Sequence, residues 1–136
     1  MRKNFTKAKR THLRNQPKYN FFKNTTYALN GLKDIIQTES SFKIELIIAL
    51  ILIPVIIFID TNLVHKALMF ISLMGMLIAE AINSAIERVV DLVTLEHHDM
   101  AGRAKDVGSS IVFLSIMVFV VTWAIIILNI FQGCDY

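Results

Sequence analysis

In Glu80-Ala-Ile-Asn83-Ser-Ala-Ile-Glu87-Arg-Val-Val-Asp91, acidic and amide side chains recur every three or four residues at the end of an apolar run that begins near Ala67. At about 100° per residue, these four polar side chains fall within an arc of roughly 80° on one side of a helix. Isoleucine and valine occupy the remainder of that helix. The pattern predicts an apolar helix with one polar stripe.

The composition around this stretch is that of a membrane protein. The chain has 136 residues, 54% of them hydrophobic, and a mean hydropathy of +0.54. Both values are too high for an ordinary soluble domain of this size, and the apolar residues lie in blocks. A single cysteine, Cys134, excludes an internal disulfide framework and a cysteine-based zinc site. We therefore expect one all-α membrane domain.

The charges are unevenly distributed along the chain. Residues 1–33 carry nine Lys or Arg and no acid. A basic arm for nucleic acid is one interpretation, but beside apolar spans a cytoplasmic segment attracted to anionic lipid head groups is favoured. No cleavable signal peptide is expected, because the first apolar run starts beyond residue 43. We predict a flexible tail over 1–18, a membrane domain over 19–136, and no nucleic-acid partner.

Residues 20–37 and three later apolar segments are the predicted helices. Apolar and basic side chains alternate over 20–37 at a spacing that suits an amphipathic helix in the membrane interface, although a linker with anchoring aromatics is the alternative. Membrane spans are predicted over about 42–63, 65–91 and 108–131. Pro54 is expected to kink the first span. Thr94–Asp106, rich in charged and imidazole side chains, is predicted to be a loop.

The positive-inside rule orients these spans. Lysine and arginine flank the first span on its amino-terminal side and occupy the loop between the second and third spans. The amino terminus and this loop are therefore expected in the cytoplasm, and the carboxyl terminus outside. The polar stripe then lies at the cytoplasmic boundary of the membrane.

Glu80 is the first candidate for chemistry. A carboxylate within an apolar span costs on the order of 3 kcal/mol on insertion scales, so it needs a partner, a proton or a water-filled cavity. Such a group is suited to act as a general base. Glu87 and Asn83 offer oxygen ligands of the kind that Mg²⁺ prefers. Glu39 and Glu45 are two further acids at the entry to the first span.

Basic and imidazole groups follow the stripe. Arg103 and Lys105, with Asp106, start the last span and could neutralise phosphate oxygens during phosphoryl transfer. The alternative is structural: Glu87 pairs with Arg103 or Lys105, while Asn83 and Ser84 make hydrogen bonds between helices. The adjacent His97 and His98 are interpreted as solvated loop residues rather than metal ligands. The chain has neither GxxxxGK[ST] nor a kinase-type glycine-rich loop, which excludes those two routes of nucleotide binding.

Three motifs resemble the prokaryotic diacylglycerol kinase family over about residues 20–131. They are Glu80-x-x-Asn83-Ser84-Ala85-Ile86-Glu87-x-x-Val90-Asp91, Glu96-x-His98, and Gly102-Arg103-Ala104-Lys105-Asp106-x-Gly108-Ser109. The resemblance implies a homotrimer in the bacterial inner membrane, with an amphipathic surface helix before three transmembrane helices. It also implies phosphorylation of diacylglycerol to phosphatidate by ATP and Mg²⁺.

The resemblance assigns roles position by position. Glu80 matches the catalytic base, and Glu39 and Glu87 match the metal-binding carboxylates. Positions that contact ATP in the family match Tyr27, Glu39, Glu87, Glu96, His97, His98, Lys105 and Asp106, and positions near the lipid match Glu80, Asn83 and Ser109. The family shares each site between neighbouring subunits. Departures from its usual residues are Asn20 for Arg, His97 for Tyr, Asp99 for Glu and Ala101 for Ser.

Two other functions remain open at this point. Undecaprenol kinase, in the same family, shares a Tyr-Ala-Leu-Asn-Gly segment like Tyr27–Gly31, but the Gly102–Ser109 segment favours the diacylglycerol branch. The other is a non-enzymatic membrane protein that uses Glu80 and Glu87 as a polar relay. Asp91 is interpreted mainly as a polar contact at the end of its helix.

Overall fold

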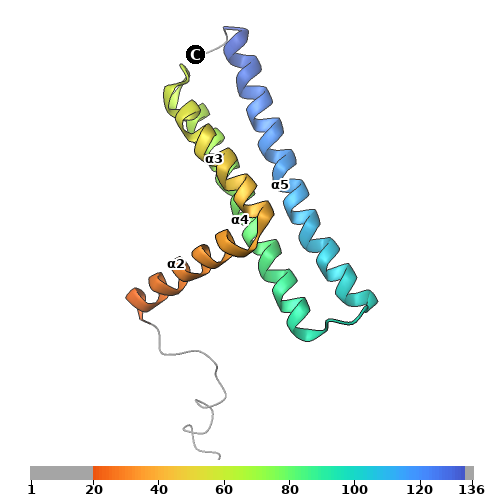
Figure 1. Cartoon of the computed structure of the whole chain (residues 1–136). Coiled ribbons are helices and arrows are strands. Elements are labelled where there is room, and N and C mark those ends of the chain that lie inside the picture. The colour runs from red at the N-terminus through yellow and green to blue at the C-terminus, as the bar shows by residue number, and fades with distance from the viewer. Residues whose placement is uncertain (1–19, 134–136) are drawn as a thin grey trace, which may run out of the picture. The chain divides into compact units, whose positions relative to one another are not determined.

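The computed structural model describes residues 20–133, and this part of the chain forms four helices joined by short connections (Figure 1). They are α2 (Phe21–Thr38), α3 (Ser40–Phe58), α4 (Leu63–Val93) and α5 (Asp99–Phe131). Contacts divide the chain into two compact units, 1–33 and 34–136, and α3, α4 and α5 belong to the second. The predicted all-α fold is confirmed, and so is a helix in the 20–37 region. The predicted basic tail over 1–18 and Cys134 lie outside the described residues.

Helices α3, α4 and α5 are each long and apolar enough to cross a membrane, as predicted. At 1.5 Å per residue, α3 is about 28 Å long, whereas α4 is about 46 Å and α5 about 50 Å. A hydrocarbon core is about 30 Å thick, so α4 and α5 are too long to lie wholly within it unless strongly tilted. Most of their charged residues lie toward the ends that the α4–α5 connection joins, and such a distribution suits contact of these ends with water.

The predicted loop over Thr94–Asp106 is wrong for most of its length, because α5 already begins at Asp99. His98 caps this helix: its Nδ1 accepts a hydrogen bond from the Met100 backbone N–H at 3.2 Å. Asp99 lies in the first turn, where a negative charge is favoured by the helix dipole. These two polar residues begin the helix at Asp99, whereas the apolar pattern predicted a start at about residue 108.

The first predicted span also ends later than the helix that forms. Helix α3 runs through Pro54 and stops at Phe58, whereas Leu63 belongs to α4. Asn62 sets this boundary, because its Oδ1 accepts a hydrogen bond from the His65 backbone N–H at 2.9 Å. An asparagine N-cap of this kind satisfies a backbone donor that would otherwise be unpaired.

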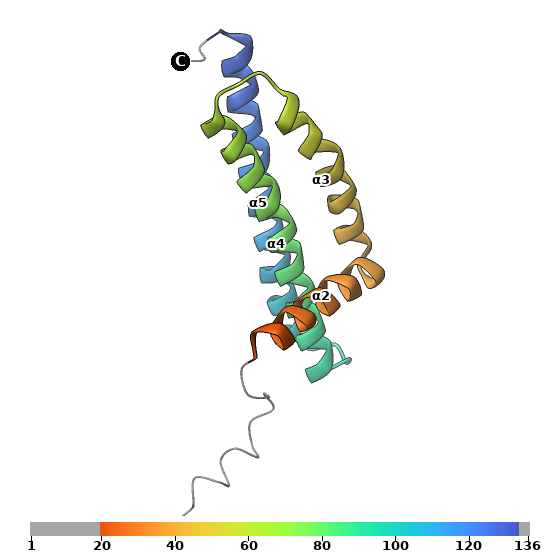
Figure 2. The same cartoon turned by 90° about the vertical axis from the view of Figure 1, so that its left-hand side faces the viewer.

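Helix α4 packs against both α3 and α5 (Figures 1 and 2). The buried core of this packing comprises Ala49, Ile56, Met69, Leu73, Met76, Trp123 and Ile126. Trp123 reaches across from α5 and donates its indole N–H to the Met69 carbonyl of α4 at 3.3 Å. A buried indole donor is costly when unpaired, so this bond helps to fix α5 against α4.

Large apolar side chains also cover the outer faces of α3 and α5. Leu50 and Ile51 on α3, and Phe113 and Leu128 on α5, each expose more than half of their surface. Soluble monomers rarely expose contiguous apolar patches of this extent. These faces suit contact with lipid or with other membrane helices.

Candidate active site

Four glutamates from two helices and the junction before α3 form an acidic cluster, which we define as Glu39, Glu45, Glu80 and Glu87. Glu80 on α4 is 6% exposed and Glu45 on α3 is 9% exposed. Glu80 interacts electrostatically with each of the other three carboxylates, and its side chain is hydrogen-bonded to that of Ser41. The structure therefore brings together two acids of the polar stripe and the two acids at the entry to the first span.

The polar stripe of α4 passes from a buried end to a water-exposed end. Glu80 and Asn83 are buried, Glu87 is half-buried, and Asp91 has 49% of its side chain exposed. The arrangement suits chemistry between an apolar and an aqueous reactant.

Asn83 is hydrogen-bonded to one other residue of the stripe. Its side-chain N–H₂ donates to Glu87 Oε1 at 3.2 Å, within α4, rather than to another helix as the structural alternative proposed. Its Oδ1 is buried and, among the described residues, has no hydrogen-bond partner. This oxygen faces Gly108 of α5, where a Cβ atom would overlap it and would lie 3.6 Å from Ile86 Cδ1. Gly108 therefore provides the space that Asn83 occupies.

Replacing Gly108 with Ala should lower the activity of this site by roughly tenfold, because overpacking a close contact costs about 1–3 kcal/mol. Asn83 has to turn away from α5 to make room, and this breaks its hydrogen bond to Glu87. Steady-state turnover of the purified variant in mixed micelles measures the loss. Gly31→Ala is the matched control, because a Cβ there meets no atom within 4 Å. Equal activity in the two variants would contradict this role of Gly108.

The basic residues after the stripe do not pair as the structural alternative proposed. Lys105 forms an ion pair with Asp91, with 2.6 Å between Nζ and Oδ1, rather than with Glu87. Glu87 still interacts with Lys105 electrostatically. Arg103 contacts Met100 through its Sδ atom at 3.9 Å. The polar contact expected of Asp91 at the end of α4 is thus a bridge to α5.

A cavity of about 170 Å³ lies where α4 ends and α5 begins. It is lined by Val90, Asp91, Thr94, Leu95, Glu96, His97, His98, Ala101, Gly102 and Lys105. The structure therefore brings together four of the predicted ATP contacts, Glu96, His97, His98 and Lys105. Ionic and imidazole donors around a small opening are suited to hold phosphate oxygens.

Other predicted positions are not among the residues that line this cavity or make up the acidic cluster. Asp106 and Ser109 are exposed on α5 and, within residues 20–133, make no side-chain hydrogen bond or ion pair. Tyr27 and Asn20 belong to the unit that ends at Lys33. Tyr27 is exposed there, and Asn20 Oδ1 accepts a hydrogen bond from the Lys23 backbone N–H at 3.3 Å.

Arg88 is a polar residue of the site region whose contacts the sequence did not indicate. It follows Glu87 directly, and its guanidinium contacts Asp34, Thr38 and Glu39, which lie 49 to 54 residues earlier. Asp34 and Thr38 are four residues apart, so they lie on the same side of a helix. This spacing is the one local sign in the sequence that both could bind the same side chain.

The carboxylates present suit Mg²⁺ bound together with a phosphate ligand. Within residues 20–133, no group of three or more His, Cys, Asp or Glu side chains is placed to hold a metal ion. Mg²⁺ usually takes one or two carboxylates and completes its shell with water and substrate phosphates. Glu39 and Glu87 supply oxygen donors of that kind.

Comparison with known proteins decides the family. The family model described as prokaryotic diacylglycerol kinase matches residues 26–127. This chain belongs to the prokaryotic diacylglycerol kinase family. The match includes α3 and α4 entirely and most of α2 and α5. Membership of a kinase family removes the non-enzymatic alternative, and the resemblance found in the three motifs is confirmed.

Three relatives illustrate the range of this kinase family. The chain is 38% identical to a diacylglycerol kinase of Haemophilus influenzae over 99 residues, which are 73% of this chain and 84% of the relative. It is 39% identical to a diacylglycerol kinase of Pseudomonas aeruginosa over 105 residues, 77% and 85% of the two chains. An undecaprenol kinase of Bacillus subtilis is 32% identical over 111 residues, 82% and 87%.

Proposed function

We propose that this kinase transfers the γ-phosphoryl group of ATP to the hydroxyl of diacylglycerol, giving phosphatidate and ADP. The observation that carries the proposal is the buried Glu80 on a helix long enough to cross the membrane, within an acidic cluster. Such a carboxylate is costly in an apolar helix and points to a function. The relatives named diacylglycerol kinase support the choice of lipid.

Glu80 is the proposed general base. It accepts the proton of the lipid hydroxyl as the hydroxyl oxygen bonds to the γ-phosphorus and the bond to the ADP oxygen breaks. Asn83, three residues further along α4, and Ser109 are the proposed lipid contacts. Because Glu80 is buried and Glu87 is nearer water, the acceptor and the nucleotide are expected to meet along this stripe.

Glu39 and Glu87 are the proposed ligands of Mg²⁺, and Glu96, His97, His98, Lys105, Asp106 and Tyr27 are the proposed contacts of ATP. When bound, the metal would neutralise charge on the phosphate oxygens. Lys105 adds a positive charge beside the cavity that the end of α4 and the start of α5 share. Its ion pair with Asp91 holds the ammonium group in place before nucleotide binds.

The enzyme is proposed to be a homotrimer in the bacterial inner membrane, with each active site shared between neighbouring subunits. The exposed apolar faces of α3 and α5 support association within a bilayer. The helix predicted over about 20–37, which is α2, is proposed to lie in the membrane interface as an amphipathic helix. The amino terminus and the α4–α5 connection face the cytoplasm, and the carboxyl terminus lies outside.

Diacylglycerol should be phosphorylated much faster than a polyprenol. Purified enzyme in mixed micelles with Mg²⁺ and labelled ATP is offered each lipid alone, and initial rates are compared at equal mole fraction. Undecaprenol kinase is the second candidate, favoured by the 32% identity to the Bacillus subtilis protein. A faster rate with the polyprenol would replace the diacylglycerol assignment, and absence of phosphorylation of either lipid would contradict lipid kinase activity itself.

A further inference from the structure

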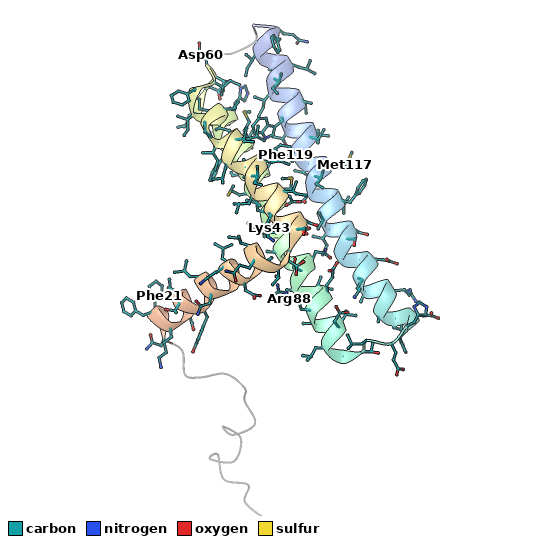
Figure 3. The ribbon with its side chains drawn as sticks, viewed as in Figure 1. Phe21, Lys43, Asp60, Arg88, Met117 and Phe119 are labelled. Carbon is teal, nitrogen blue, oxygen red and sulfur yellow. The ribbon has the colours of Figure 1, made fainter. Side chains whose placement is uncertain are left out.

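One arginine of α4 binds three side chains at the junction of α2 and α3. The Nη1 group of Arg88 contacts Asp34 Oδ2. Its Nη2 group donates to Thr38 Oγ1 at 2.6 Å and to Glu39 Oε1 at 3.2 Å. All four residues belong to the unit that starts at Asp34, and Figure 3 labels Arg88 on α4. We call this group the Arg88 clamp.

The clamp acts on the residue that connects two helices. Glu39 lies between the end of α2 at Thr38 and the start of α3 at Ser40, with an extended backbone at φ −100° and ψ 115°. It occupies the N-cap position of α3, but its side chain makes no capping hydrogen bond. The free N–H groups of a helix start attract a carboxylate. The Glu39 carboxylate instead binds Arg88.

Electrostatic repulsion also opposes this position of Glu39. Glu39 and Glu80 repel each other, and Glu80 is repelled by Glu87 as well. Among the described residues, Arg88 is the only one that donates a hydrogen bond to the Glu39 carboxylate. Its positive charge therefore holds Glu39 beside α4 against the repulsion of the acidic cluster.

We propose that Arg88 is a positioning residue that keeps the Glu39 carboxylate turned toward α4, ready to bind Mg²⁺ with ATP. Arg88 takes Oε1 of Glu39 and, among the described residues, Oε2 accepts no hydrogen bond, so one oxygen is left for the metal. This role rests on the proposed function of Glu39 as a metal ligand. A group that hydrogen-bonds a metal-binding carboxylate fixes its orientation in the same way as other outer partners of metal sites.

The geometry of the clamp requires arginine. The guanidinium presents several N–H donors in a planar fork, and the clamp uses both terminal nitrogens for three acceptors from two adjoining segments. A lysine ammonium keeps the charge but not the fork. Arg88 and Asp34 expose 44% and 53% of their side chains. Exposed ion pairs contribute little to stability, so the loss of the clamp should affect the site more than the fold.

The test compares Arg88→Ala, Arg88→Lys and Asp34→Asn with the wild type in the full-length detergent-solubilised protein. Mn²⁺ is titrated in the presence of a non-hydrolysable ATP analogue and followed by electron paramagnetic resonance. Arg88→Ala should weaken Mn²⁺ binding by about tenfold or more, the usual effect of losing an outer partner of a metal ligand. Arg88→Lys and Asp34→Asn should weaken it less. In phosphotransfer assays, the Mg²⁺ concentration for half-maximal rate should rise while the KM for diacylglycerol stays constant.

Lys43→Ala is the matched control. Lys43, labelled in Figure 3, is another exposed cation near the α2–α3 junction, and its Nζ donates to the Gln37 carbonyl at 3.0 Å. Among the described residues it forms no hydrogen bond or ion pair with the Glu39 carboxylate. Its Mn²⁺ affinity should stay within about twofold of the wild type, since its charge is solvated and screened. A loss equal to that of Arg88→Ala would attribute the effect to charge alone and overturn the positioning role.

Glu39→Gln separates the proposed role of Glu39 as a metal ligand from the proposed role of Arg88 in positioning it. Retention of wild-type Mn²⁺ affinity in Glu39→Gln would remove Glu39 as a ligand and, with it, the proposed function of that residue. If Glu39→Gln loses affinity while Arg88→Ala and Arg88→Lys both bind Mn²⁺ like the wild type, the ligand stands and the positioning role of Arg88 is overturned. Size-exclusion elution and thermal unfolding of each variant verify that the assembled protein is being compared.

Discussion

Glu80→Gln is expected to lower the turnover number by about 10²–10⁴-fold, the contribution typical of a positioned general base. The amide has nearly the shape of the carboxylate but does not accept the proton of the lipid hydroxyl. The fold should be preserved, because Glu80 is 6% exposed and the substitution removes a buried charge that repels Glu45. Assembly, measured by size exclusion, should therefore match the wild type while phosphotransfer is lost.

Glu45→Gln provides the comparison for this variant. Glu45 is also a buried carboxylate, on α3, and it interacts with Glu80. It has no assigned part in the transfer of the proton, so Glu45→Gln should retain measurable turnover. A Glu80→Gln enzyme with more than about a tenth of the wild-type rate would rule out Glu80 as the base, because this loss is far below the range for general-base catalysis.

The helices and the polar stripe were predictable because they depend on local periodicity. Apolar runs of sufficient length indicated three spans, and the three- and four-residue spacing of Glu80, Asn83 and Glu87 placed them on one side of a single helix. The gradient of burial along the stripe also follows from the sequence, since the apolar run ends at Glu80. Residues near in sequence are sufficient for each of these inferences.

The start of α5 was not predictable from the same signals. Polar residues dominate Thr94–Asp106, so hydropathy indicated a loop, whereas His98 and Asp99 begin a helix whose first turns carry charges. A helix start of this kind depends on capping rather than on apolar periodicity. The structural alternative considered for Lys105 paired it with Glu87. As part of a helix, it pairs with Asp91.

Contacts between distant residues were the other part that the sequence did not reveal. Arg88 binds Asp34 across 54 positions, and Gly108 makes room for Asn83 between two helices. Charge patterning shows whether a side chain is positive or negative but not which residue it pairs with. A glycine within a helix likewise does not show which side chain packs against it. Both contacts require the relative placement of helices, which local propensity does not determine.

Glu87→Gln is expected to raise the Mg²⁺ concentration for half-maximal activity by about tenfold or more, since even outer partners of a metal ligand contribute that much. Glu87 is half-buried about two turns beyond Glu80, and its Oε1 accepts a hydrogen bond from the Asn83 side chain at 3.2 Å. Glutamine keeps the length of the side chain and an oxygen acceptor for Asn83. The variant therefore removes the charge that holds a divalent cation while preserving the contact along α4.

Asp91→Asn makes the same change of charge one turn further along the stripe. Asp91 is half-exposed and paired with Lys105, so its effect on Mg²⁺ dependence should stay within about threefold, as expected for an exposed ion pair. The two variants are compared by titrating Mg²⁺ at saturating ATP and diacylglycerol. Normal Mg²⁺ dependence in Glu87→Gln would exclude it as a ligand. An equal change of Mg²⁺ dependence in both variants would instead assign the effect to the net charge of the stripe. A direct metal ligand at position 87 requires a larger change in Glu87→Gln than in Asp91→Asn.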